Sequence, residues 1–122
     1  VDWDTWVNDT YVGRNYEGTV IGVDAAQLTA SSLLSRFVSD AGNNFINYNN
    51  PAYDKLYTET FAETDDAKRT QGFKDCVRML CDDAANVYIQ DLPEFVAINK
   101  KYTGYRFYPM YVLDVACIRP AE

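Results

Sequence analysis

Apolar residues in the first quarter of the chain form two different patterns. Within residues 3–12 they recur at the spacing of one helical face, which predicts a short helix that Asp2 caps and Gly13 ends. The residues of that face are Trp3, Trp6, Val7 and Tyr11. Residues 18–23 (GTVIGV) form instead a short, apolar, β-branched run, which predicts a buried strand.

Two helices are predicted from the same helical spacing in residues 29–62. The first spans residues 29–39 and is followed by a loop that contains Gly42 and three asparagines. Its inward residues are Leu33, Leu34, Phe37 and Val38. Pro51 directly follows Asn50, a pair that is pre-organised to start the second helix. The inward residues of this second helix are Tyr53, Leu56, Tyr57, Thr60 and Phe61.

A longer helix is predicted to begin at residues 64–66, where two carboxylates suit the positive end of a helix dipole. Its inward residues are Phe73, Val77, Leu80, Cys81 and Ala84. Its charged residues lie mainly outside this stripe and indicate a solvated face.

Beyond Asn86 the apolar residues recur at every second position instead of at helical spacing. Residues 87–91 and 94–99 are predicted strands, separated by a proline that interrupts pairing, and residues 112–118 form a last strand. The order of strands and helices predicts the α/β class. We expect one domain that spans residues 1–122.

Composition narrows the classes of function. The chain has 122 residues, a formal net charge of −7 and no histidine. The absence of histidine removes Ser-His-Asp and Cys-His nucleophiles and every imidazole metal site. The acidic balance without a basic stripe argues against nucleic acid as a partner. No pair of carboxylates is marked as acid and base, so we expect no enzyme, no catalytic residue, no metal and no cofactor.

The start of the chain points to a segment of a larger protein, and the cysteines point to free thiols. Residue 1 is a valine, no leader-like or membrane-spanning stretch is present, and we expect a mature or trimmed piece of a longer chain. Cys76 and Cys81 would lie on different sides of one helix, which makes them poor disulfide partners. With Cys117 they are expected to be buried free thiols.

Two features of the sequence can each be interpreted in two ways. Asp24 follows the predicted strand of residues 18–23, and ligands gather at the carboxyl ends of strands in open α/β sheets, but an aspartate there is also an ordinary turn or capping residue. Trp3 and Trp6 suit a stacking platform for a sugar or a peptide side chain, and they equally suit core anchors of the first helix.

Several helix starts, a strand and a turn occur in a familiar order. The segment NYNNPAYD precedes one helix, DDAKR starts the next, and VYIQDL and YTGY follow. The residues concerned are Asn47, Tyr48, Asn50, Pro51, Tyr53 and Asp54, then Asp65, Lys68 and Arg69, then residues 87–92, and finally Tyr102, Gly104, Tyr105 and Pro109. In this order the chain resembles the C-terminal part of the family 5 extracellular solute-binding proteins of ABC transporters, the dipeptide/oligopeptide-binding type.

The resemblance implies a fold and a ligand-binding segment. The fold would be part of one lobe of a type II periplasmic-binding-protein-like fold. The family's G-W-x-A-D-Y segment, which reaches the ligand cleft, is matched by residues 20–25, with Ile21 in place of the Trp and Ala25 in place of the Tyr. The implied ligand-binding residues are Gly22, Val23, Asp24 and Ala25. These departures leave peptides and other small solutes open as the ligand.

The expected function follows from this resemblance. The full-length parent would be an extracellular or periplasmic protein, tethered as a lipoprotein, that captures a peptide or similar small solute between two lobes. It would deliver that ligand to a transmembrane permease, and the second lobe would be a further partner. The alternative from the residues alone is a stand-alone interaction module whose aromatic surface recognises a protein.

Overall fold

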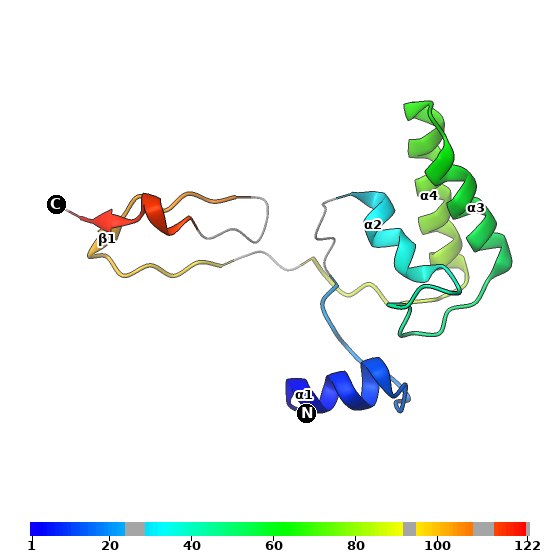
Figure 1. The fold of residues 1–122 in the computed structure, drawn as a ribbon, viewed down its shortest axis with the longest axis horizontal. Helices are drawn as coiled ribbons and strands as arrows, with labels where there is room; N and C mark the ends of the chain where they lie inside the picture. Colours follow the sequence, from blue (N-terminus) through cyan, green and yellow to red (C-terminus); the bar gives the residue numbers. More distant parts are fainter. Residues whose placement is uncertain (24–28, 92–94, 109–113, 122) are drawn as a thin grey trace. The chain divides into compact units, whose positions relative to one another are not determined.

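The computed structural model describes residues 1–23, 29–91, 95–108 and 114–121. The chain divides into two compact units, Val1–Val87 and Tyr88–Glu122, and each is described by itself. Across the described residues the architecture is mixed helical with one small two-stranded sheet (Figure 1). This architecture is compatible with a fragment of an α/β protein. The expectation of one domain over residues 1–122 stays a prediction.

The first helical segment forms as its residues predict. α1 (Trp3–Thr5) continues directly into the π-helix η1 (Trp6–Val12), and the Asp2 carboxylate accepts a hydrogen bond of 3.0 Å from the Thr5 N–H. Gly13 ends the segment, and its N–H donates to the Asn8 carbonyl five residues back. That spacing belongs to a π-helix, so the turn is wider than the predicted α-helix.

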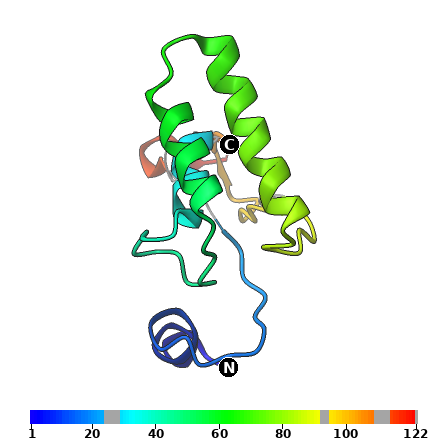
Figure 2. The same cartoon turned by 90° about the vertical axis from the view of Figure 1, so that its right-hand side faces the viewer.

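Three helices of the first unit pack side by side and form its core (Figures 1 and 2). They are α2 (Ala30–Leu34), which continues as the 3-10 turn η2 (Ser35–Phe37), then α3 (Pro51–Ala62) and α4 (Asp66–Asp82). The buried core residues are Leu34, Phe37, Tyr53, Cys76 and Leu80. The Tyr53 hydroxyl donates to the Leu34 carbonyl at 2.8 Å, which satisfies a polar atom inside this core.

The starts of α3 and α4 are set by local side chains. Asn50 is the cap of α3, and its Oδ1 accepts from the Ala52 and Tyr53 N–H groups. Asp65 is the cap of α4, and its carboxylate accepts from the Lys68 N–H at 2.9 Å. Both starts confirm the positions that the sequence predicts.

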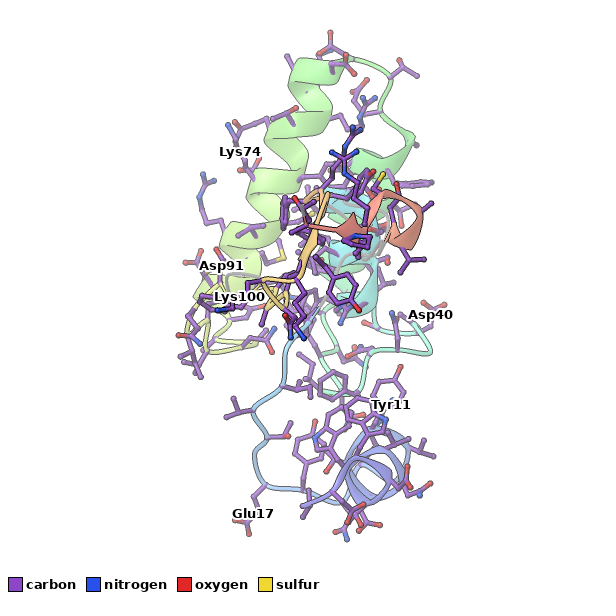
Figure 3. The ribbon with its side chains drawn as sticks, turned by 90° about the vertical axis from the view of Figure 1, so that its left-hand side faces the viewer. Tyr11, Glu17, Asp40, Lys74, Asp91 and Lys100 are labelled. Carbon is purple, nitrogen blue, oxygen red and sulfur yellow. The ribbon has the colours of Figure 1, made fainter. Side chains whose placement is uncertain are left out.

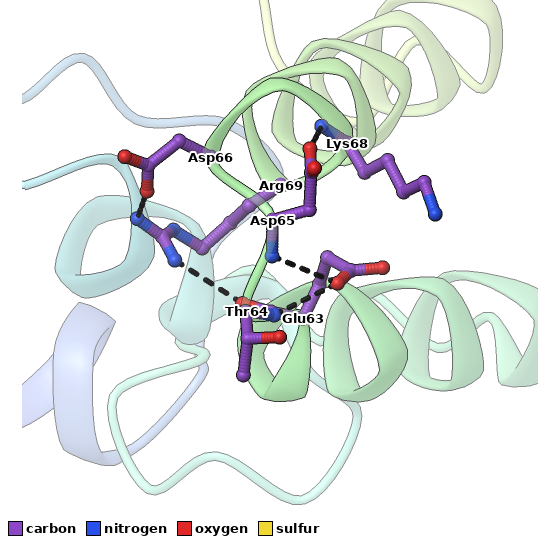
Figure 4. A network of polar contacts seen from close by, with 6 residues as sticks. All are labelled: Glu63, Thr64, Asp65, Asp66, Lys68 and Arg69. Carbon is purple, nitrogen blue, oxygen red and sulfur yellow. Dashed lines mark hydrogen bonds and ion pairs between the residues drawn. The ribbon is translucent and has the colours of Figure 1, made fainter.

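A polar network closes the turn between α3 and α4 (Figure 4). The Glu63 carboxylate accepts from the Thr64 and Asp65 N–H groups at 2.8 and 2.9 Å. Arg69 donates to the Glu63 carbonyl and pairs with Asp66. These contacts fix the turn between the two helices, so the turn belongs to the scaffold.

The second unit contains the sheet. β1 (Tyr102–Thr103) pairs antiparallel with β2 (Arg119–Pro120), in a register that places Tyr102 opposite Pro120. The 3-10 turn η3 (Val115–Cys117) precedes β2. Gly104 adopts φ +92°, and a Cβ there would lie 2.0 Å from the Cys117 carbonyl oxygen, so only glycine fits this close approach.

The predicted strands are wrong in the residues that the structure describes. Residues 18–23, 87–91 and 95–99 carry no regular secondary structure, and residues 115–117 form η3 instead of a strand. Residues 114 and 118 also carry no regular secondary structure, and the predicted strand positions 94, 112 and 113 lie outside the described residues. A strand needs a neighbour to pair its backbone N–H and C=O groups, and none of the described segments pairs with these runs.

Several predicted inward positions are also wrong. On α3, Phe61 is 63% exposed, and on α4 Val77 is 44% exposed. Cys81 and Ala84 are exposed as well, whereas Cys76, which was expected on no inward stripe, is fully buried. The reason is geometric, because α4 contacts α2 and α3 through residues 73, 76 and 80, a face rotated from the predicted one.

The cysteines follow the prediction in part. All three are free thiols. Only Cys76 is buried, while Cys81 is exposed and Cys117 is half-buried. The expectation of three buried thiols is therefore wrong for two of them.

Candidate functional site

The predicted ligand-binding segment begins in an exposed stretch of the first unit that has no regular secondary structure. Gly22 and Val23 are exposed, and nothing lies within 4 Å of a Cβ built on Gly22. Val23 has 42% of its surface exposed. Asp24 and Ala25 lie outside the described residues. The four predicted residues are thus neighbours along the chain, and the described part brings no further site residue to them.

An aromatic cluster, formed by Trp3, Trp6, Tyr11 and Phe45, anchors the start of this stretch. The Trp6 Nε1–H donates to the Thr19 hydroxyl at 2.8 Å. The Trp6 ring contacts the other three rings, at centroid distances of 5.3, 5.9 and 5.8 Å respectively. This cluster fixes where the stretch leaves the helix, because Thr19 is held while the residues after it are open.

Two further contacts hold the cluster together. The Tyr16 hydroxyl donates to the Phe45 carbonyl at 2.7 Å, which ties the segment after η1 to the loop before α3. The Arg14 guanidinium lies over the Tyr11 ring, 5.6 Å from its centroid. Figure 3 shows Tyr11 within this group of side chains beside the N-terminal helix.

The cluster separates the two interpretations of the tryptophans. Trp6 is half-buried and acts as the anchor, as predicted. Trp3 is 64% exposed, so its prediction as a core residue is wrong. Phe45 and Thr19 were not predicted as members of this cluster. Helical periodicity gives no signal for either residue, because both lie outside helices.

Residues that carry the family resemblance are mostly structural. The Tyr48 hydroxyl donates to the Asp83 carboxylate at 2.5 Å, and the Asn50 amide donates to the same oxygen at 2.7 Å. Burial and the hydrogen bond to Asp83 raise the pKa of Tyr48 to about 12, and the two donors lower the pKa of Asp83. The Asp54 carboxylate accepts from the Ser39 N–H at 2.9 Å. These contacts join the end of α4 and the loop before α3 to the start of α3.

A second polar cluster lies in the second unit. The Tyr108 hydroxyl and the Cys117 thiol both donate to the Asp114 carboxylate, at 3.1 and 3.0 Å. The hydrogen bond to this carboxylate raises the pKa of the thiol, and the two donors lower the pKa of the carboxyl group. The thiol is thus kept protonated, which is the opposite of what a nucleophile needs.

A shallow apolar groove of about 360 Å³ lies between α2 and α4. Its lining residues are Ala30, Leu34, Thr70, Phe73, Lys74 and Val77. Figure 3 shows Lys74 on α4. Gly22 and Val23, the described residues of the predicted segment, are not among the residues that line the groove.

Neither a cluster of metal ligands nor a membrane-spanning helix occurs in the part of the chain that the structure describes. Within ranges 1–23, 29–91, 95–108 and 114–121, no group of three or more His, Cys, Asp or Glu side chains is placed to hold a metal ion. In these ranges none of the helices combines the length and apolarity that crossing a membrane requires.

Comparisons with known proteins give three partial matches to periplasmic binding proteins. A probable D,D-dipeptide-binding periplasmic protein of Escherichia coli K12 is 36% identical over 63 residues, which are 52% of this chain and 12% of that protein. A periplasmic oligopeptide-binding protein of Haemophilus influenzae is 32% identical over 72 residues, 59% of this chain and 13% of that protein.

The third match is the periplasmic oligopeptide-binding protein of Salmonella typhimurium, 29% identical over 86 residues, 70% of this chain and 16% of that protein. The chain therefore spans 12–16% of the length of these relatives. All three are named as binding proteins, and none as an enzyme. No protein-family model and no solved structure matches the chain.

Proposed function

We propose that this chain is part of the solute-binding component of an ABC importer, which captures a peptide or a similar small solute outside the membrane. The parent delivers that solute to a transmembrane permease and belongs to the family 5 solute-binding proteins. It acts in the periplasm or at the cell surface, where a lipid anchor tethers it. The observation that carries the proposal is the similarity over 63–86 residues to three periplasmic dipeptide- and oligopeptide-binding proteins.

The residues assigned to the ligand are Gly22, Val23, Asp24 and Ala25. Two observations support this assignment. The stretch that leads to Asp24 is exposed and has no regular secondary structure, and the Trp6–Thr19 hydrogen bond holds its start. An aspartate at the end of such a stretch suits the amino group of a peptide, because a carboxylate pairs with an ammonium ion.

The chain alone presents only part of a binding site under this proposal, since it spans 12–16% of its relatives. A ligand that is enclosed between two lobes loses most of its contacts when one lobe is incomplete. We expect the isolated chain to bind di- and tripeptides weakly or not at all in calorimetry. Micromolar binding of such peptides by this chain would contradict the proposed two-lobed site.

The decisive experiment uses the full-length parent, purified without unfolding, and mass spectrometry of the small molecules released from it. We expect short peptides or a related small solute, and the released compound is then titrated back by calorimetry. Asp24→Ala should weaken its binding by at least about tenfold if the carboxylate pairs with a buried ammonium.

Asp40→Ala is the matched control, because Asp40 is an exposed aspartate in the loop after η2 (Figure 3). It should leave the affinity unchanged. Equal affinity of the Asp24→Ala protein and the control would remove Asp24 from the site. A parent that releases no small molecule and binds none would favour the alternative, a protein-interaction module with an aromatic surface.

A further inference from the structure

One ring of the aromatic cluster has a face that no other described ring covers. Trp3 is 64% exposed, and among the described residues only the Trp6 ring stacks on it, with an interplanar angle of 18°. Trp6 is itself held by Thr19 and by the edge contact with Phe45. The outer face of the Trp3 indole is therefore a flat, exposed surface on a fixed support.

This surface lies in an acidic part of the chain. The first 35 residues contain one basic side chain, that of Arg14. Their acidic residues are Asp2, Asp4, Asp9, Glu17 and Asp24. Asp2 and Asp4 flank Trp3 directly and are exposed. The Arg14 guanidinium is already placed over Tyr11 and donates to the Tyr11 carbonyl, so it does not neutralise the carboxylates beside Trp3.

We propose that the outer face of Trp3 binds the guanidinium group of an arginine side chain in a peptide, with Asp4 supplying the opposite charge. The negative face of an indole attracts cations more strongly than the other aromatic rings do. A guanidinium is planar and weakly hydrated, so it stacks on such a face better than an ammonium ion. Arg14 over Tyr11 shows the same pairing within the same cluster.

The inference is separate from the proposed function. It concerns Trp3 and not residues 22–25, and it holds for any arginine-containing peptide, whether or not the parent transports that peptide. Its test measures binding at the Trp3 ring, whereas the test of the proposed function identifies the released solute and measures the effect of Asp24→Ala on its affinity. Failure of one therefore leaves the other standing.

The test is a nuclear magnetic resonance titration of the isotope-labelled chain with acetyl-Gly-Arg-Gly-amide at low salt. The same peptide with citrulline in place of arginine is the comparison ligand, because citrulline keeps the planar shape and loses the charge. The chain has two tryptophans, both in the cluster, so the two indole N–H resonances report on this region alone. We expect a saturable shift of the Trp3 resonance and about tenfold tighter binding of the arginine peptide.

Three variants make the test specific. Trp3→Leu keeps an apolar side chain and should abolish binding, read by the Trp6 resonance and by calorimetry. Asp4→Asn leaves the ring in place and should weaken binding several-fold. Phe61→Leu is the matched control, because Phe61 is 63% exposed on α3 and lies outside the cluster, and it should bind as the unaltered chain does.

The outcomes that overturn the proposal are distinct. Equal affinity for the arginine and citrulline peptides would show an apolar contact without charge recognition. Unchanged binding in Trp3→Leu would place the peptide elsewhere, and the absence of a saturable shift would show that this face of Trp3 has no such ligand.

Discussion

The close approach of α3 and α4 depends on one missing side chain. A Cβ on Gly72 of α4 would lie 2.3 Å from the Oγ1 and 2.7 Å from the Cγ2 of Thr60 on α3, and Thr60 is only 5% exposed. A clash with a buried side chain forces the helices apart or the side chain out of its rotamer. Glycine at this position is therefore a packing requirement, although it weakens the helix itself.

Gly72→Ala should lower the free energy of unfolding by up to about 2 kcal/mol, because overpacking costs about 1–3 kcal/mol and the better helix propensity of alanine returns about 1. Urea unfolding measures the change. The loss should shrink in a Thr60→Ala background, which removes the two nearest atoms. Gln71→Ala, at the neighbouring exposed position, is the control. An equal loss in both backgrounds would show that the contact with Thr60 is not the cause.

The Tyr48–Asp83 pair predicts a loss of stability at high pH. The pKa of Tyr48 is raised to about 12 in the folded chain, so the hydrogen bond to Asp83 stabilises fully below pH 10 and is lost as the pH rises from about 10 to about 12. The urea midpoint should fall more steeply over this range in the unaltered chain than in Tyr48→Phe. Tyr88→Phe, which alters an exposed tyrosine, should keep the steep fall. Parallel curves for all three proteins would contradict this pH dependence.

At the scale of elements, the helix starts were predictable and the packed faces were not. Asn50 with Pro51, and Asp65 before α4, are local signals, because a cap and the helix it starts lie within a few residues of one another. Which face of α4 is buried depends on α2 and α3, so the predicted inward stripe left out Cys76, although its thiol was expected to be buried, and wrongly included Val77. In the candidate site, Trp6 was predicted as an anchor, but its partners Thr19 and Phe45 come from distant loops.

Asn50 acts on two elements at once, and two substitutions separate its roles. Its Oδ1 caps α3, while its Nδ2 donates to Asp83 at the end of α4. Asn50→Ala should cost about 1–2 kcal/mol, since it removes both. Asn50→Asp keeps a capping oxygen but places a second carboxylate against Asp83. Its stability should therefore improve as the pH falls far enough to protonate that pair, whereas Asn50→Ala gains nothing there.

Thermal unfolding followed by circular dichroism at neutral and acidic pH measures this difference. Asn49→Ala, the neighbouring exposed asparagine, controls for the loss of an amide before the helix. If Asn50→Asp and Asn50→Ala respond alike to pH, the amide of Asn50 does not mediate the contact with Asp83.

At the scale of the whole molecule, three segments without regular secondary structure expose large apolar side chains to solvent. Val20 is 80% exposed, Val87 is 87% exposed and Phe95 is 89% exposed. Their β-branched and aromatic residues fit a sheet, yet none of the described segments pairs with them. Under the proposed function, the rest of the parent supplies the missing neighbours, because this chain spans only 12–16% of its relatives.

This interpretation predicts where backbone amides are protected from hydrogen exchange. In the isolated chain, the amides of residues 18–23 should exchange rapidly, since they lack a ladder, while those of α4 around Leu80 should exchange slowly. In the full-length parent, both segments should be slow, because a paired strand protects its amides as a helix does. Mass spectrometry of peptic peptides from both proteins gives the comparison, with α4 as the internal control. Rapid exchange of residues 18–23 in the parent would mean that this stretch is an exposed connection and not a strand of a larger sheet.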